Sequence, residues 1–188
     1  PFAGGELIIE MSPESFEEQG AVKAEIGRVL TQFIREQRLG YYRIDRTLIS
    51  NKLAGLSAEP DSLFLFQRTI DSGRVTFTPE AGRPQSSKEI VGSVDWVLEI
   101  VSPSSKRKDE RILCDSYYKA SIPEYWLIDV LGDEIDFKIL VPGDAGYIAV
   151  TPQDGWLASP TFGRNFRLSR QRDEMGYWEY TLEMQQLL

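Results

Sequence analysis

The chain has 188 residues, of which 41% are hydrophobic and 27% charged, a balance that predicts a single domain, residues 1–188, with a sizeable core. No apolar run approaches the roughly 18 residues that span a bilayer, and the start is not signal-like, so we expect a cytoplasmic protein with no membrane partner. Histidine is absent, which excludes histidine catalysis and Cys/His zinc sites, and the net charge of −8 opposes nucleic-acid binding unless positive charges gather on one surface.

A long amphipathic helix is predicted near the N-terminus, after a short strand over residues 6–10. The helix starts either at Ser12, before Pro13, or at Ser15, which has the capping-box spacing to Glu18. Its apolar stripe ends near residues 39–40 and consists of Val22, Ile26, Val29, Leu30, Phe33 and Ile34. Glu25 lies at the edge of this stripe, where its carboxylate either stays in water or reaches into a cleft.

Asp61 is placed at the mouth of a strand, because Pro60 favours extended backbone just before it and the apolar run 62–66 follows. An aspartate there is by default a turn residue. Residues 67–89 show little periodicity and predict a long loop or a loose hairpin at 74–78. Another strand is predicted over residues 41–49, with a turn at 51–56.

The most apolar stretch, residues 94–101, predicts a strand buried on both faces, with a carboxylate, Glu99, in its middle. Side chains alternate along a strand, so Asp95, Val97, Glu99 and Val101 share one face, while Trp96, Leu98 and Ile100 share the other. An isolated buried carboxylate would cost several kcal/mol. Glu99 is therefore protonated, paired with a cation in a structural ion pair, or bound to a metal.

The densest basic run of the chain follows that strand in sequence. It consists of Lys106, Arg107 and Lys108 and is either a solvated loop or an anion-binding element. A helix is predicted over residues 109–120. Beyond it we expect a buried strand at 124–129, a strand pair at 134–141 and 146–151, a loop at 163–167, and a last strand or short helix at 177–184. This order favours a mixed α/β or α+β fold with helices packed on a central sheet.

Three segments together resemble one family: Pro60-Asp61 opening a strand, Glu99-Ile-Val-Ser-Pro-Ser-Ser105 leading to Asp109, and Ile122-Pro-Glu-Tyr-Trp-Leu-Ile-Asp129. The chain resembles the Uma2 family of restriction-endonuclease-like proteins, common in cyanobacteria and part of the PD-(D/E)XK nuclease superfamily. The resemblance covers most of the chain. It implies a restriction-endonuclease-like fold, with a mixed central β-sheet, flanking helices and additional antiparallel strands.

The resemblance also implies a magnesium-dependent endonuclease acting on DNA, in which Asp61 and Glu99 hold Mg²⁺ or Mn²⁺ and no organic cofactor takes part. Glu25 is a further metal-ligand candidate. The usual lysine position is Val101, and the position where many relatives carry a lysine in the next helix aligns with Leu113. Lys106 and Lys108 are therefore the candidates for a relocated lysine. Where the family often has a histidine near the start of its first helix, the chain offers Glu18 or Gln19.

Two alternatives to an active nuclease stay open: a catalytically weak or inactive nuclease-fold protein that binds nucleic acid or protein, and a protein in which Glu99 is only a structural ion pair. The second half of the chain is rich in large aromatic residues, which are frequent in association surfaces, so we also expect a homodimer. They are Tyr125, Trp126, Trp156, Trp178 and Tyr180.

Overall fold

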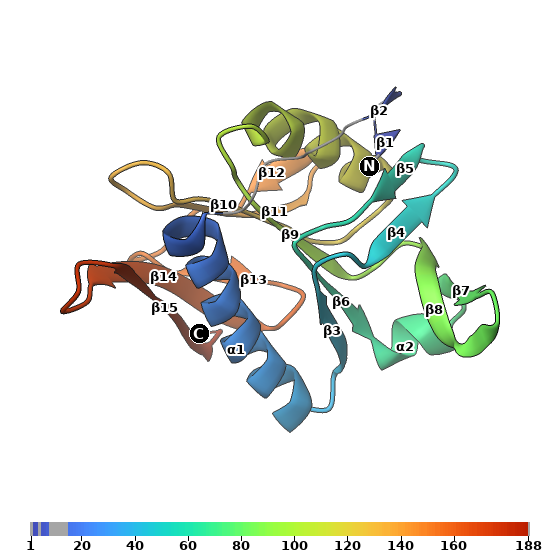
Figure 1. Cartoon of the computed structure of the whole chain (residues 1–188), viewed down its shortest axis with the longest axis horizontal. Helices are drawn as coiled ribbons and strands as arrows, with labels where there is room; N and C mark the ends of the chain where they lie inside the picture. The colour runs from blue at the N-terminus through green and yellow to red at the C-terminus, as the bar shows by residue number, and fades with distance from the viewer. Residues whose placement is uncertain (1, 4, 8–14, 188) are drawn as a thin grey trace.

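A six-stranded mixed sheet forms the centre of the computed structural model, which describes residues 2–3, 5–7 and 15–187 (Figure 1). In spatial order its strands are β12 (Tyr147–Ala149), β11 (Asp136–Pro142), β10 (Tyr125–Asp129), β9 (Trp96–Ile100), β6 (Ser62–Phe66) and β3 (Gly40–Ile44). Strands β9 and β10 run parallel, whereas the other neighbours in this sheet are antiparallel. A parallel pair needs a crossover. It is supplied by η2 (Lys108–Leu113) and α3 (Cys114–Lys119), which confirms the predicted helix.

Strand β9 is buried along its whole length, as predicted from its apolar run. Trp96, Leu98 and Ile100 pack into one hydrophobic core, whereas Val97 and Val101 pack into a second core on the opposite face. The predicted alternation is confirmed. Because Glu99 has the parity of the second group, its side chain belongs to that second face.

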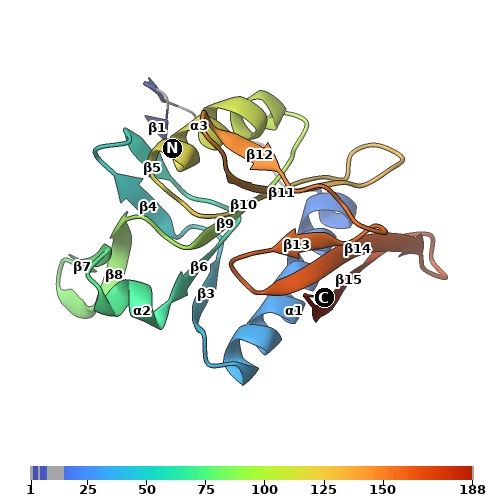
Figure 2. The same ribbon diagram turned by 180° about the vertical axis from the view of Figure 1, so that it is seen from behind.

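The first core lies under α1 (Ala21–Glu36) and a three-stranded sheet (Figures 1 and 2). That sheet consists of β13 (Leu157–Ser159), β14 (Arg164–Arg172) and β15 (Trp178–Gln186). Large rings meet edge to face here. The Trp126 ring centroid lies 5.2 Å from that of Trp96 and 4.8 Å from that of Phe166. Such pairs stabilise the core beyond the burial of apolar area alone.

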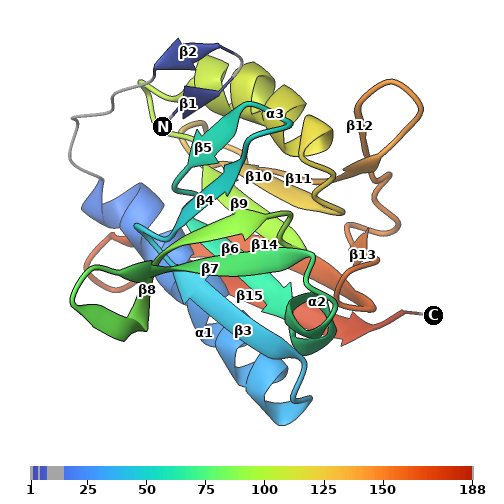
Figure 3. The same ribbon diagram turned by 90° about the vertical axis from the view of Figure 1, so that its right-hand side faces the viewer.

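The second core is covered by α3 and by a second six-stranded sheet. In spatial order this sheet contains β2 (Glu6–Leu7), β1 (Phe2–Ala3), β5 (Leu56–Ala58), β4 (Leu48–Asn51), β8 (Arg83–Gly92) and β7 (Val75–Glu80). Figure 3 shows β7 and β8 as a hairpin on the near side, next to the short helix α2 (Gln67–Asp71). The central sheet is thus enclosed between two cores.

Three predicted segments were wrong in detail. Residues 67–89 are not a long loop: they contain α2, β7 and most of β8, and the hairpin is longer than the one predicted at 74–78. Its strands are mostly exposed, so burial imposed little alternation on their sequence. Residues 164–167 of the predicted loop at 163–167 belong to β14, and the strand predicted at 41–49 is split into β3 and β4.

The first helix begins as predicted at Ser15, whose Oγ accepts a hydrogen bond from Glu18 N at 3.3 Å. The reciprocal bond comes from Gln19, whose Oε1 accepts from Ser15 N at 2.9 Å, and not from the Glu18 side chain. A π-helical turn, η1 (Phe16–Gly20), then leads into α1. The alternative start at Ser12, and residues 8–10 of the predicted first strand, lie outside the described residues.

The aromatic residues that favoured a homodimer are largely accounted for within one chain. Tyr125, Trp126 and Tyr180 are buried in the two cores. The Trp156 and Trp178 rings are half-buried and covered by arginine guanidinium groups, for example that of Arg167 at 4.6 Å from the Trp156 centroid. The homodimer stays a prediction.

In the described part of the chain, no helix has the length and apolar character needed to cross a bilayer.

Candidate active site

Asp61 and Glu99 come from neighbouring strands of the central sheet. Ser62 pairs with Leu98 in the antiparallel register of β6 and β9, so the next position in that register sets Asp61 opposite Glu99. Opposed residues of antiparallel strands share a face. The Asp61 carboxylate is fixed there because its Oδ2 accepts a hydrogen bond from Ile100 N at 2.6 Å. The sequence therefore placed both acids correctly relative to the strands.

Glu99 is a buried acid held by a tyrosine. Glu99 is 4% exposed, and the Tyr117 hydroxyl of α3 donates a hydrogen bond to its Oε1 at 2.5 Å. Burial raises the pKa of Glu99 well above its usual value, and the negative charges of Asp109 and Asp61 raise this pKa further. Lys108 and the Tyr117 hydrogen bond oppose the rise in pKa. The charged form of Glu99 is therefore unfavourable at this buried position unless positive charge lies nearby.

A lysine and a third acid reach this region from η2. Lys108 Nζ lies 3.2 Å from Asp109 Oδ1, and the two side chains are 11% and 1% exposed. The Ser105 hydroxyl donates to Asp109 Oδ2, which anchors the acid at the start of the crossover. Because Lys108 lowers the pKa of Glu99, its charge acts on the same cluster. Sequence reasoning named Lys108 but missed Asp109 and Tyr117 as neighbours of Glu99.

Lys23, which sequence reasoning missed, reaches Asp61 from α1. Its Nζ lies 3.0 Å from Asp61 Oδ1 and 2.8 Å from Asp45 Oδ1, and its side chain is 8% exposed. The signal was present in the sequence. Lys23 stands three residues before Ile26 and seven before Leu30, on the apolar stripe of the helix, and a lysine on a buried stripe needs a carboxylate partner.

Lys106 does not join this cluster. Its side chain is 57% exposed, and its Nζ lies 2.9 Å from Asp129 Oδ2 at the end of β10. The Asp129 hydrogen bond raises the pKa of Lys106, whose ammonium group lies at the surface, where ion pairs contribute little. Of the two predicted lysines, the structure brings Lys108 to the carboxylates and turns Lys106 to the surface.

Glu25 does not join the cluster either. At about 100° per residue it lies about 200° around the helix from Lys23, so it faces away from Asp61. Its Oε2 pairs with Arg28 at 2.7 Å, and its Oε1 accepts from Leu182 N of β15 at 3.0 Å. The Arg28 hydrogen bond holds the pKa of Glu25 below its usual value. Glu25 therefore caps a backbone donor of β15 in this structure.

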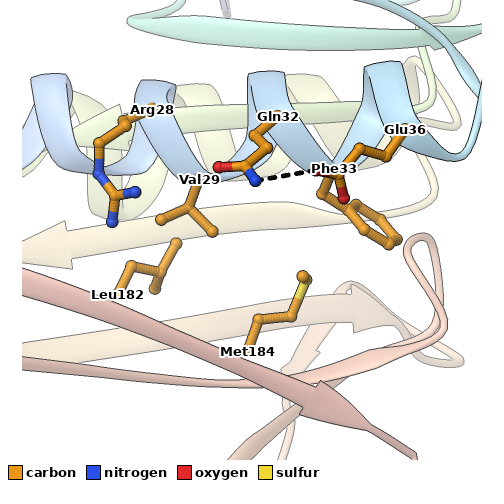
Figure 4. Close-up of a pocket in the computed structure, with 7 residues that line it drawn as sticks. All are labelled: Arg28, Val29, Gln32, Phe33, Glu36, Leu182 and Met184. Atoms are coloured by element: carbon orange, nitrogen blue, oxygen red, sulfur yellow. Dashed lines mark hydrogen bonds between the residues drawn. The ribbon is translucent and has the colours of Figure 1, made fainter.

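A pocket of about 240 Å³ opens on that other side of α1, between the helix and β15 (Figure 4). Its lining is Arg28, Val29, Gln32, Phe33, Glu36, Leu182 and Met184. The Gln32 side chain donates to Glu36 Oε1 at 2.8 Å along the α1 side of the pocket. None of the candidate catalytic residues lines this pocket, so it is separate from the acid cluster.

The two positions where the resemblance implies a lysine are closed. Val101 is fully buried, and Leu113 is 1% exposed, both in the second core. A lysine at either position would have to bury its charge among apolar side chains. The lysines that approach the two acids in this structure are instead Lys108 and Lys23.

Asp61 and Glu99 fit a magnesium ion by the chemistry of their donors. Mg²⁺ prefers oxygen ligands, keeps several waters, and is usually bound through one or two carboxylates. Within residues 2–3, 5–7 and 15–187, no cluster of three or more His, Cys, Asp or Glu side chains is arranged around a metal position. A magnesium site here would therefore rest on the two carboxylates, with water completing it.

Comparisons with known proteins identify the family and the fold of the chain. The family profile that matches the chain is Uma2, described as "Putative restriction endonuclease", over residues 2–171. No curated protein matches the chain. Among solved structures, the chain is similar to the crystal structure of a putative nuclease from Anabaena variabilis ATCC 29413, with a TM-score of 0.58 and 18% identity, covering 85% of this chain and 80% of that one. The predicted nuclease-like α+β fold is confirmed.

Proposed function

Since the chain belongs to the Uma2 family of restriction-endonuclease-like proteins, we propose that it is a metal-dependent endonuclease that hydrolyses DNA phosphodiester bonds. The proposal assigns Mg²⁺, or Mn²⁺ in its place, to Asp61 and Glu99. The observation that supports it most is the pairing of these two acids on one face of adjacent strands, one of them with a strongly raised pKa. Perturbed acids with a specific charge partner are typical of functional sites.

Each residue of the cluster has a role in this proposal. A divalent ion between Asp61 and Glu99 would neutralise charge on the scissile phosphate and lower the pKa of a bound water. Tyr117 donates to one oxygen of Glu99 and leaves its other oxygen for binding. Lys108, 11% exposed beside Asp109, brings positive charge to the place where phosphate charge increases during hydrolysis.

The experiment is cleavage of plasmid and single-stranded DNA with Mg²⁺, with Mn²⁺ and with EDTA. We expect DNA cleavage with either metal and none with EDTA. If the chain binds Mn²⁺ but leaves every DNA and RNA substrate intact, the proposal of nuclease activity is wrong.

Lys108 and Lys106 provide a matched pair of substitutions. Lys108→Met is expected to lower the cleavage rate at least about tenfold, because it removes a nearly buried positive charge next to the acids. Lys106→Met removes a charge that lies in solvent beside Asp129, and the rate is expected to change by less than about twofold. Single-turnover rates measure both. Equal losses would mean that the basic run acts as a general DNA-binding surface.

A non-catalytic binding module is the second candidate. It is favoured by the closed core around Val101 and Leu113, where the resemblance implies a lysine. Such a protein would bind Mn²⁺ or DNA without turnover. Gel-shift and metal-binding measurements on the same preparation as the cleavage assay separate the two functions.

A further inference from the structure

Lys23 is a buried cation between two carboxylates. Its side chain is 8% exposed, and its Nζ atom lies 2.8 Å from Asp45 Oδ1 and 3.0 Å from Asp61 Oδ1. An ammonium group this deeply buried is strongly unfavourable without a negative partner, because water cannot solvate it. Lys23 must therefore keep a carboxylate even when Asp61 takes on another role.

The turn between β3 and β4 holds Asp45 next to Asp61. Asp45 and Arg46 both have left-handed backbone, with φ of 38° and 52°, which is uncommon outside glycine. Asp45 N also donates a hydrogen bond to Asp61 O at 3.1 Å. The Asp45 side chain is 48% exposed, compared with 20% for Asp61. The fold thus sets a second, more exposed carboxylate beside the candidate metal ligand.

We infer that Lys23 is the counter-ion of Asp61 before a divalent cation binds, and that Asp45 keeps Lys23 paired once the cation takes Asp61. This inference rests on the proposed function, because it assigns the metal to Asp61. A divalent ion on Asp61 would repel an ammonium group that lies 3.0 Å from the same carboxylate. Lys23 already contacts Asp45, so it can leave Asp61 and still keep a carboxylate as its partner.

Two opposite changes in metal affinity follow. Lys23→Met removes a cation that competes for Asp61, so Mn²⁺ is expected to bind at least about threefold more tightly. Asp45→Asn removes one carboxylate that holds Lys23 and so strengthens its pairing with Asp61, and Mn²⁺ is expected to bind at least about threefold more weakly. Calorimetric titration of the whole chain with Mn²⁺, without DNA, measures both affinities.

The double variant Lys23→Met with Asp45→Asn is the matched control. If Asp45 acts through Lys23, the Asp45→Asn substitution should change Mn²⁺ affinity by less than about twofold once Lys23 is gone. An Asp45→Asn effect of equal size in both backgrounds would mean that Asp45 acts only as a nearby charge. That result would overturn the inference.

Two further outcomes decide the inference. A folded Lys23→Met protein that binds Mn²⁺ no more tightly than the wild type overturns it. If circular dichroism shows that Lys23→Met does not fold, the Asp45→Asn protein decides, because unchanged Mn²⁺ affinity at this half-exposed position also overturns it. Failure of the proposed site is distinguishable, since wild type and Glu99→Gln would then bind Mn²⁺ equally or not at all.

Discussion

Replacing Glu99 with glutamine is expected to abolish Mn²⁺ binding at the acid cluster and to lower DNA cleavage at least about a hundredfold. The amide keeps the shape of the side chain and can still accept from the Tyr117 hydroxyl, which now holds Glu99 Oε1 at 2.5 Å. It removes the negative charge that a divalent ion needs. Asp61→Asn is expected to give the same loss. Calorimetry with Mn²⁺ and single-turnover cleavage measure the two effects.

Glu25→Gln is the matched control, because it makes the same change at a glutamate on the side of α1 that faces away from Asp61. Glu25 pairs with Arg28 and caps Leu182 N, and no contact of its carboxylate involves Asp61 or Glu99 among the described residues. Cleavage by this variant is expected to stay within about twofold of wild type. A loss equal to that of Glu99→Gln would instead place Glu25 among the metal ligands, as the resemblance to the Uma2 family allowed.

The Glu99→Gln substitution is also expected to change how the stability of the fold depends on pH. The pKa of Glu99 in the folded protein is raised above its ordinary value of 4.5, so the folded state holds this proton at pH values where the unfolded chain has lost it. The stability that the protonated form contributes is full below about pH 4.5 and is lost as the pH rises through the folded-state pKa. Metal-free Glu99→Gln is therefore expected to be more stable than wild type at neutral pH and similar at low pH.

Thermal melts of both proteins in EDTA, from about pH 4 to 8, test this expectation. Adding Mn²⁺ at the high end of the range should raise the melting temperature of wild type and leave that of Glu99→Gln unchanged. Parallel melting curves at all pH values would contradict the buried, proton-holding state of Glu99.

Replacing Glu124 with alanine is expected to destabilise the fold by at least about 3 kcal/mol. The side chain is fully buried just before β10, and its carboxylate accepts from Trp126 Nε1 at 2.6 Å, Ser159 Oγ at 2.6 Å and Thr161 N at 2.9 Å. Burial raises the pKa of Glu124, although these hydrogen bonds oppose the rise. Alanine would leave three donors without an acceptor at the junction of β10 with β13.

Urea unfolding measures the loss, and two variants control for it. Glu124→Gln keeps the shape and one acceptor oxygen, so its loss is expected to be smaller than that of alanine. Glu174→Ala removes an exposed glutamate at the tip of the β14–β15 hairpin and is expected to change the free energy of unfolding by less than about 0.5 kcal/mol. If Glu124→Ala and Glu174→Ala unfold at the same urea concentration, the buried network does not stabilise the fold.

Local pattern determined the parts of this protein that lie within one element. The apolar run of β9 predicted a strand buried on both faces, and the two-residue alternation placed Glu99 and Trp96 on opposite faces, as observed. Asp61 was placed at the start of β6 by Pro60 and the apolar run that follows. These predictions depend only on neighbours in sequence, because such neighbours determine where a strand begins and which of its faces each side chain occupies.

Tertiary structure alone decided which charges meet. Lys23 and Glu25 are two residues apart, yet only helix rotation against the sheet sends Lys23 to Asp61 and Glu25 to β15. In the same way, the rotation of the crossover sends Lys108 toward Glu99 and leaves Lys106 in solvent. Sequence spacing does not specify these contacts, because they depend on how distant elements pack against one another. The burial of the Glu99 carboxyl group could be predicted from its strand, but its partners could not.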